Sequence, residues 1–177
     1  MTDADGAPLS PGFLLWHATL RWQRLIAAAL KPLGLTHVQF VLLAVLWWFV
    51  TVRGERPSQR ALAEQAGTDP MMTSQVVRAL ERKGLVVREP DPADSRARQL
   101  RLTPKGRRLA RKAIGVVEAA DEEFFAAARD PKRLPAELMA LAALEGRPVP
   151  TVASRRRQRV DSSAETTTSG PSGAVRR

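Results

Sequence analysis

The chain has 177 residues and 44% hydrophobic side chains, enough for one domain with a core and too short for two full domains. Its 28 Lys and Arg outnumber its 18 Asp and Glu, and the net charge of +10 favours a polyanionic partner, which could be DNA, RNA or an anionic membrane. Because cysteine is absent and the chain has two histidines, disulfides and thiolate metal sites are excluded, and we expect no metal and no cofactor.

The two ends of the chain differ from its middle in composition. Residues 1–9 carry acidic side chains and no basic segment, so they do not resemble a secretory signal, and we expect a flexible N-terminus and a cytoplasmic location. Residues 151–177 are rich in Ser, Thr and Arg and have almost no large apolar side chains, which is typical of a disordered basic tail. We therefore expect one folded domain over residues 10–150.

The first predicted helix covers about residues 11–31. Ser10 is a good cap, Pro11 suits a first helical turn, and Pro32 with Gly34 ends the pattern. Apolar residues at spacings of three and four predict one inward stripe, made of Leu15, Ala18, Trp22, Leu25 and Ala29.

The second predicted helix runs from Thr36 to about Val52 and is apolar on nearly every side, which indicates burial between other elements. Residues 33–52 carry no formal charge and reach the length of a membrane span. Their uninterrupted apolar run, however, covers only residues 40–50, which suits a buried core helix better. We expect no membrane partner.

Two short helices follow, joined by a turn that contains glycine. Ser58 can cap the first and Gly67 can close it, whereas Asp69 and Pro70 begin the second, which Gly84 ends. This arrangement predicts a helix-turn-helix unit, whose second helix can lie in the major groove of DNA.

After Gly84 the pattern changes to a hairpin. Residues 85–89 and 98–102 read as strands, with a turn rich in proline and aspartate between them. A fifth helix begins at Thr103 and extends to about Arg129, and a short last helix starts after Pro135 and stops at Gly146. The predicted fold class is mainly α with a small β wing, which is a winged helix-turn-helix with additional helices.

Basic charge is concentrated where this geometry needs it, because residues 53–112 contain 15 Lys and Arg and 7 Asp and Glu. On the outer face of the second short helix, Gln75 can pair with adenine, Arg78 can reach guanine or phosphate, and methionine can touch thymine methyl groups. The alternative is an ordinary solvated helix face. The candidate DNA contacts on this helix are Met71, Met72, Ser74, Gln75 and Arg78.

In the predicted wing, Asp94 and Arg96 lie two residues apart in the turn. A carboxylate in that position can orient a guanidinium for a narrow minor groove. Alternatively, Asp94 only initiates the turn and Arg96 is solvated. The remaining candidate DNA contacts are three arginines for phosphates and two residues that begin the first short helix, namely Arg88, Arg98, Arg101, Ser58 and Gln59.

Residues 33–106 resemble the MarR family of bacterial transcription regulators, with ALERKGLV, DPADSR and LTPKG in the expected order. The resemblance extends in outline over residues 10–146. It implies a homodimer with a DNA-binding lobe at about 53–103 and dimerisation helices at about 11–31 and 104–146. Asp94 and Arg96 match the wing motif of the family. Gln75 stands where many members have arginine, and Pro70, Met71 and Met72 replace commoner small polar residues.

The resemblance also implies a ligand site, because many members are repressors released by small aromatic or phenolic compounds bound between the dimerisation region and the DNA-binding lobe. Candidate ligand-binding residues on the helices beside that space are Trp16, His17, Arg21, His37, Gln39 and Phe40. Alternatively, the tryptophan is a core residue and His37 only completes a helix start.

Together these features predict a sequence-specific, duplex-DNA-binding transcription regulator of the MarR type, a homodimeric repressor of a pseudo-palindromic operator. The alternative is a ligand-insensitive architectural protein, in which the basic run from Arg155 to Arg159 binds any duplex. No nucleophile triad, phosphate-binding glycine loop or metal-ligand spacing occurs in the sequence, so we do not expect an enzyme.

Overall fold

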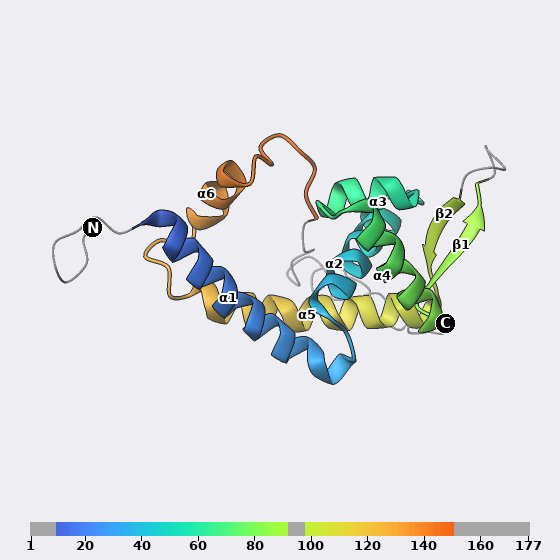
Figure 1. Ribbon diagram of the computed structural model, residues 1–177, viewed down its shortest axis with the longest axis horizontal. Coiled ribbons are helices and arrows are strands. Elements are labelled where there is room, and N and C mark those ends of the chain that lie inside the picture. The colour runs from blue at the N-terminus through green and yellow to red at the C-terminus, as the bar shows by residue number, and fades with distance from the viewer. Residues whose placement is uncertain (1–9, 92–97, 151–177) are drawn as a thin grey trace, which may run out of the picture.

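The computed structural model describes residues 10–91 and 98–150. Within them the chain forms six α-helices and one antiparallel hairpin, as predicted for a winged helix-turn-helix (Figure 1). In chain order the elements are α1 (Pro11–Leu30), the 3-10 turn η1 (Lys31–Leu33), α2 (His37–Trp48), the π-helical turn η2 (Phe49–Arg53), α3 (Gln59–Ala66), α4 (Pro70–Arg82), β1 (Val86–Pro90), β2 (Arg98–Leu102), α5 (Pro104–Phe125) and α6 (Leu134–Leu141).

The long helix α5 is the support on which the other elements are arranged. Helices α1 and α2 both pack against it, and α2 also contacts α3 and α4. Helices α3 and α4 and the hairpin therefore gather at one end of α5, whereas α6 lies near the other end (Figure 1). This arrangement separates a compact lobe, which holds the helix-turn-helix and the wing, from a more extended helical part.

The predicted helix starts are confirmed by hydrogen bonds of their cap side chains. Each cap oxygen accepts from a backbone N–H in the first turn of its helix, which satisfies a donor that has no partner inside the helix. The five caps are Ser10, Thr36, Ser58, Asp69 and Thr103. Thr36 and Gln39 form a reciprocal capping box.

One hydrophobic core joins all these elements except α6. Helix α2 is its centre, because Leu42, Leu43 and Leu46 are at most 1% exposed. The expectation of a buried second helix is therefore confirmed. Among the described residues no single helix is long and apolar enough to cross a membrane. Only the pair Pro11–Leu33 and His37–Arg53 meets those criteria, and it is bent by 76°.

Several boundaries differ from the prediction. The second helix changes to the wider π-helical turn η2 after Trp48. Helix α5 ends at Phe125 rather than near Arg129, and α6 covers Leu134–Leu141 rather than the residues from Pro135 to Gly146. The prediction from periodicity alone made these helices too long. The segment after α5 and helix α6 bury no residue fully, so packing contributes little to their helical stability.

The inward stripe predicted for α1 is only partly correct. Trp22, Leu25 and Ala29 do pack against the core, but the fully buried residues of this helix are Ile26 and Leu30. At the other end of α1, Leu15 is 57% exposed and Ala18 is exposed. The first half of α1 thus extends beyond the core of the single chain (Figure 1).

A close junction fixes the hairpin against the start of α5. The backbone N–H of Thr103 donates to the carbonyl oxygen of Leu85 at 3.0 Å, and its hydroxyl donates to that of Gly84 at 2.7 Å. Gly106 is buried in the same junction, and a Cβ atom there would overlap the carbonyl group of Leu85. The orientation of the wing relative to α5 is therefore set by direct backbone contact.

Candidate nucleic-acid interface and ligand cavity

Helix α4 presents one buried face and one free face. Thr73, Val77 and Leu80 are at most 1% exposed. The hydroxyl of Thr73 is satisfied within the turn, since it bonds to the carbonyl oxygen of Asp69 and the hydroxyl of Thr68, both at 2.8 Å. The apolar spacing of the sequence predicts Thr73, Val76, Val77 and Leu80 on the inward side of this helix, and the structure confirms it, with Val76 half-buried at the margin.

The outward face of α4 carries the predicted contact residues. Met71 is 73% exposed and Met72 is 39% exposed, and Gln75 and Arg78 are also exposed, whereas Ser74 is half-buried. Two large thioether side chains exposed at the beginning of a helix are unusual for a merely solvated surface. This face has the residue types that can read base edges and thymine methyl groups.

The helix before the turn contributes less free polar surface than predicted. The hydroxyl of Ser58 is exposed and accepts the N–H of Ala61 at 3.1 Å, so it acts as the cap of α3. The amide oxygen of Gln59 accepts from Nη2 of Arg88 at 3.0 Å and holds that arginine of the wing against α3.

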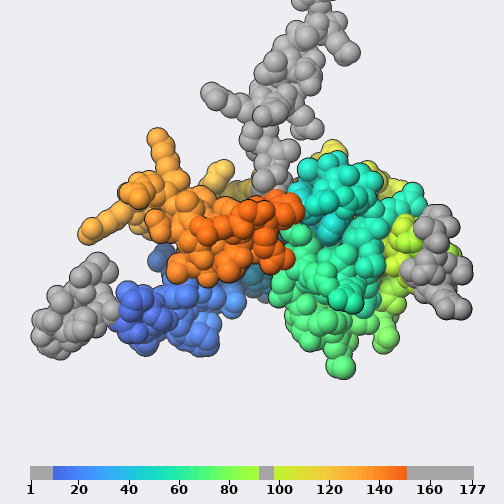
Figure 2. Space-filling view, turned by 90° about the horizontal axis from the view of Figure 1, so that it is seen from above, coloured from blue at the N-terminus to red at the C-terminus, as the bar shows by residue number. Residues whose placement is uncertain are grey.

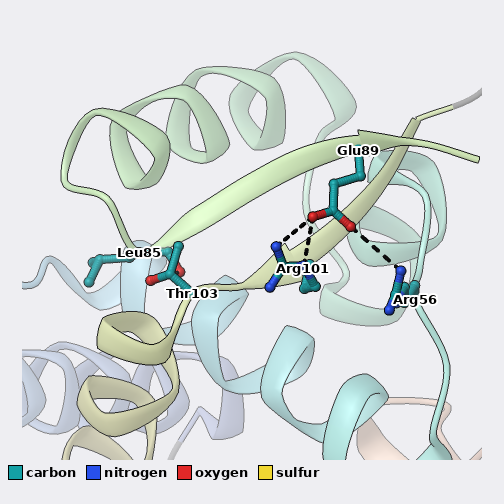
Figure 3. Close-up of polar contacts among 5 residues, drawn as sticks. All are labelled: Arg56, Leu85, Glu89, Arg101 and Thr103. Atoms are coloured by element: carbon teal, nitrogen blue, oxygen red, sulfur yellow. Dashed lines mark hydrogen bonds and ion pairs between the residues drawn. The ribbon is translucent and has the colours of Figure 1, made fainter.

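The wing arginines differ in how they are held. Arg101 donates to Glu89 from the neighbouring strand, and Arg56 lies 3.5 Å from the other oxygen of the same carboxylate (Figure 3). The hydrogen bond from Arg101 lowers the pKa of Glu89, whereas the same contact raises the pKa of Arg101. Arg88 lies 3.5 Å from Glu81.

Among the three arginines predicted to contact phosphates, Arg98 is exposed at the start of β2, while Arg88 and Arg101 are half-buried and held by other side chains. Asp94 and Arg96, predicted at the wing tip, lie outside the described residues. The exposed cations available beside α4 and the hairpin thus include Arg78 and Arg98.

A cavity of about 250 Å³ lies between α1, α2 and α5. Of the predicted ligand-binding residues it contains His37 and Phe40. Aromatic, aliphatic and acidic side chains line it: Trp22, His37, Phe40, Val41, Ala44, Val45, Trp47, Trp48, Ile114, Val117, Glu118, Asp121 and Pro150. Pro150 reaches the cavity because Gln65 of α3 donates to the carbonyl oxygen of Pro148 at 2.8 Å. Figure 2 shows this segment, at the red end of the colour scale, lying beside the lobe that contains α3.

The other four predicted ligand residues lie elsewhere. Trp16 is 61% exposed, and the ring of His17 packs edge-on against Phe13 on α1. Arg21 lines a separate groove of about 560 Å³ between α1, α5 and α6. Gln39 belongs to the capping box and accepts from Nζ of Lys83 at 2.8 Å.

The sequence prediction missed the acidic wall of the cavity. Asp121 accepts a 2.7 Å hydrogen bond from Nε1 of Trp22, whose ring lies 5.0 Å edge-on from that of His37. Burial lowers the pKa of His37, and the nearby charge of Asp121 opposes this effect. A signal existed, because Ile114, Glu118 and Asp121 repeat at helical spacing and place two carboxylates on the inward side of α5.

A helix with an exposed amino-terminal face, preceded by a short helix and a tight turn and followed by a basic hairpin, defines a winged helix-turn-helix DNA-binding protein. The family model described as MarR family matches residues 35–97. The HTH-type transcriptional regulator YdcH of Bacillus subtilis is 46% identical over 124 residues, which cover 70% of this chain and 84% of YdcH. The chain therefore belongs to the MarR family of transcription regulators, which is not a family of enzymes.

Two further relatives extend the comparison. The HTH-type transcriptional repressor Rv2887 of Mycobacterium tuberculosis is 36% identical over 132 residues, which cover 73% of this chain and 88% of the relative. CouR of Rhodococcus jostii RHA1, solved with p-coumaroyl-CoA, is 32% identical, with a TM-score of 0.64 over 74% of this chain and 90% of CouR. The structure of CouR bound to a 23-mer DNA duplex is 28% identical to this chain, with a TM-score of 0.65. The match covers 76% of this chain and 92% of CouR.

Proposed function

We propose that the protein is a homodimeric repressor that binds a pseudo-palindromic operator through α4 and the wing and is released by a small aromatic ligand. The observation that carries this proposal is the outward face of α4, where Met71 and Gln75 are exposed in the amino-terminal half of the helix and Arg78 is exposed three residues further on. In helix-turn-helix proteins this part of the second helix contacts base edges. Gln75 would read adenine and Arg78 guanine or phosphate.

Wing contacts complete the proposed interface. Arg98 is exposed and available for a phosphate, and Arg88 and Arg101 add positive charge beside it. Ser58 and Gln59 lie at the start of α3, where they would contact the DNA backbone. We assign Asp94 and Arg96 to the minor groove on the strength of the sequence motif alone.

The proposed dimer rests on exposed apolar surface. Large apolar side chains gather on the first half of α1 and on α6, and such patches mark contacts with other proteins. They are Phe13, Leu14, Leu15, Trp16, Leu138 and Leu141, with exposures from 39% to 79%. Two copies joined through α1, α5 and α6 would present two α4 helices to successive major grooves, which fits a pseudo-palindromic site.

The relatives support repression and release by a ligand. Rv2887 is named as a repressor, and CouR has been solved both on a DNA duplex and with p-coumaroyl-CoA. The cavity between α1, α2 and α5 is the candidate effector site, because it lies between the helices proposed for dimerisation and the lobe that carries α4. A cytoplasmic location follows from binding chromosomal DNA.

The direct test is selection of duplex fragments from a random pool by the purified full chain, followed by affinity measurements at 0.15 M salt. We expect one enriched motif with approximate two-fold symmetry, bound at least about 1,000-fold more tightly than random DNA. Gln75→Ala should relax the preference at one base pair of each half-site, whereas Gln23→Ala, an exposed glutamine on α1, should leave the motif unchanged.

The competing function is architectural binding of DNA without sequence preference. It is suggested by the basic run from Arg155 to Arg159, whose arginines can bind the phosphates of any duplex. That function predicts equal affinity for the selected and the random duplex at matched salt. Such a result would overturn the proposed repressor. A chain ending at residue 150 should keep the selected motif and lose part of the salt dependence of binding.

A further inference from the structure

Arg88 lies on the face of the hairpin that packs against the helices. Its strand partner is Leu100, and two residues earlier Val86 occupies the same side of β1; both apolar side chains are 1% exposed. Successive side chains of a strand point to opposite faces, so Arg88 shares the inward face with them, whereas Glu89 and Arg101 form their contact on the other face. The side chain of Arg88 is accordingly only 29% exposed.

From that face the guanidinium of Arg88 reaches both helices of the helix-turn-helix unit. Its Nη2 donates to the amide oxygen of Gln59 on α3 at 3.0 Å, and its buried Nε lies 3.5 Å from a carboxylate oxygen of Glu81 on α4. The side chain of Glu81 is 28% exposed, so water screens this ion pair less than a pair on an open surface. One side chain therefore connects β1 with α3 and α4.

Two backbone hydrogen bonds fix other parts of the hairpin. The N–H of Leu100 on β2 donates to the carbonyl oxygen of Pro57 at 2.9 Å, just before α3, and the N–H of Thr103 donates to Leu85 at the base. Neither of these bonds involves α4, whereas the ion pair of Arg88 does. Arg88 thus adds an attachment that relates the hairpin to the helix with the proposed base contacts.

The geometry of an arginine side chain suits this attachment. A guanidinium is planar and offers several N–H donors in fixed directions, so one group can hold acceptors on two separate elements. The ammonium group of lysine is a compact point charge on a flexible stem, and it keeps the charge without that fixed geometry. Arg98 differs from Arg88, because it is exposed at the start of β2 and available for a phosphate.

We propose that Arg88 is a positioning residue, which holds the hairpin at the angle to α4 that allows both to contact one duplex, and that it does not itself bind a phosphate. This role replaces the phosphate contact expected from the sequence. Holding the hairpin before DNA arrives lowers the cost of ordering it during binding, so the benefit appears as affinity contributed by other residues, among them Arg98. The inference deepens the proposed function and rests on it for the DNA-binding surface.

The test is a double-mutant cycle between Arg88 and Arg98, measured as affinity of the full chain for the selected duplex at 0.15 M salt. Arg98→Gln alone should weaken binding about tenfold, as expected for a lost contact with DNA. Arg88→Lys keeps the positive charge and should still weaken binding at least about fivefold. In that background Arg98→Gln should weaken binding by less than about twofold more, because the hairpin no longer presents Arg98 to the DNA.

A phosphate contact by Arg88 predicts a different pattern. Lysine would then retain most of the affinity, and Arg98→Gln would have the same effect in both backgrounds. Either result overturns the proposal, and so does a wild type that tolerates Arg98→Gln, since the hairpin then contributes no affinity through that residue. Arg111→Lys makes the same exchange at an exposed position on α5 and should leave the affinity unchanged. Circular dichroism checks that every variant is folded.

Glu81 gives a second test, in which the two roles of Arg88 differ in sign. Removal of a carboxylate beside a DNA-binding surface raises the affinity for a polyanion when charge alone matters. If Glu81 acts by holding Arg88, Glu81→Met should instead weaken binding of the selected duplex at least about threefold. Glu122→Met removes the same charge from an exposed position on α5 and should not weaken binding. Unchanged or tighter binding by Glu81→Met contradicts the proposal.

A measurement without DNA separates this inference from the proposed function. Since the chain has no cysteine, spin labels can be attached at Arg82→Cys on α4 and Pro90→Cys on β1, with unlabelled chain in excess so that distances between subunits do not contribute. Arg88→Lys should broaden the distribution of distances between the labels, and Arg111→Lys should not. An unchanged distribution overturns the inference even if the protein selects a duplex. Failure of the wild type to select a duplex overturns the repressor proposal, and a broadened distribution still supports the attachment of the hairpin by Arg88.

Discussion

Arg101 on β2 donates through both Nε and Nη2 to a single carboxylate oxygen of Glu89 on β1, with 2.8 Å for the bond from Nε. The strand register pairs Arg101 with Val87 and Glu89 with Gln99, so the contact runs diagonally across the hairpin (Figure 3). Since Arg56 approaches the same carboxylate, one acidic side chain partly neutralises two arginines, Arg101 of the proposed DNA-binding surface and its neighbour Arg56.

We expect Glu89→Gln to increase the affinity for any duplex and to steepen its dependence on salt. Removal of the carboxylate frees Arg101 and Arg56 for phosphates, and each additional phosphate contact changes the slope of log K against log salt by about 0.9. Fluorescence anisotropy with random DNA over a range of KCl concentrations measures this slope. Glu137→Gln on α6 is the control for net charge, and an identical slope in both variants would argue against the wing contact.

A second prediction concerns the junction between the hairpin and α5. Gly106→Ala places a methyl group against the carbonyl of Leu85, which is backbone and cannot rotate away. We expect a loss of about 1 to 3 kcal/mol in the free energy of unfolding, as is typical of overpacking. Urea denaturation measures it. Gly12→Ala on α1, where nothing lies within 4 Å of the added atom, should instead be neutral or stabilise by up to about 1 kcal/mol.

A third prediction tests the apolar surface of α1 and α6. Leu141 is 79% exposed in the single chain, so Leu141→Glu should leave each subunit folded and raise the dissociation constant of the dimer at least tenfold. Sedimentation velocity over a dilution series measures this constant. Val52→Glu introduces the same charge at another exposed apolar residue, on η2, and should not change assembly. A monomeric wild type would refute the proposed dimer outright.

A fourth prediction follows from the buried position of His37. Its pKa is lower in the folded protein than the ordinary value of 6.5, so the unfolded chain takes up a proton first as the pH falls. The free energy of unfolding should therefore decrease between pH 7.5 and pH 5.5. His37→Phe keeps a ring beside Trp22 and removes the titration, so its stability should decrease less over the same interval. Thermal melts at the two pH values compare the proteins, with His17→Phe as an exposed control.

Much of the local structure could be predicted because short-range chemistry decides it. Ser58, Asp69 and Thr103 cap helices with their own side chains, and Gly67 and Gly84 adopt the left-handed conformation that ends the preceding helices. The spacing of apolar residues at intervals of three and four likewise identified which face of α4 is buried. These features depend on residues within a few positions of one another, so the sequence was sufficient to recognise the winged helix-turn-helix.

Which residues line the cavity, and which partner each charged side chain has, depend on contacts between segments that are distant in the sequence. The hydrogen-bonded residues Trp22 and Asp121 are 99 positions apart in the sequence, and Arg88 and its acceptor Gln59 are 29 positions apart. Periodicity placed Arg21 and His37 on helices, but only the packing of α1 and α2 against α5 put Arg21 into the groove and His37 into the cavity. Local spacing thus determined where elements begin and which face is apolar, whereas the packing of whole helices decided which polar side chains meet, because side-chain interactions act over a few ångströms in space and not along the chain.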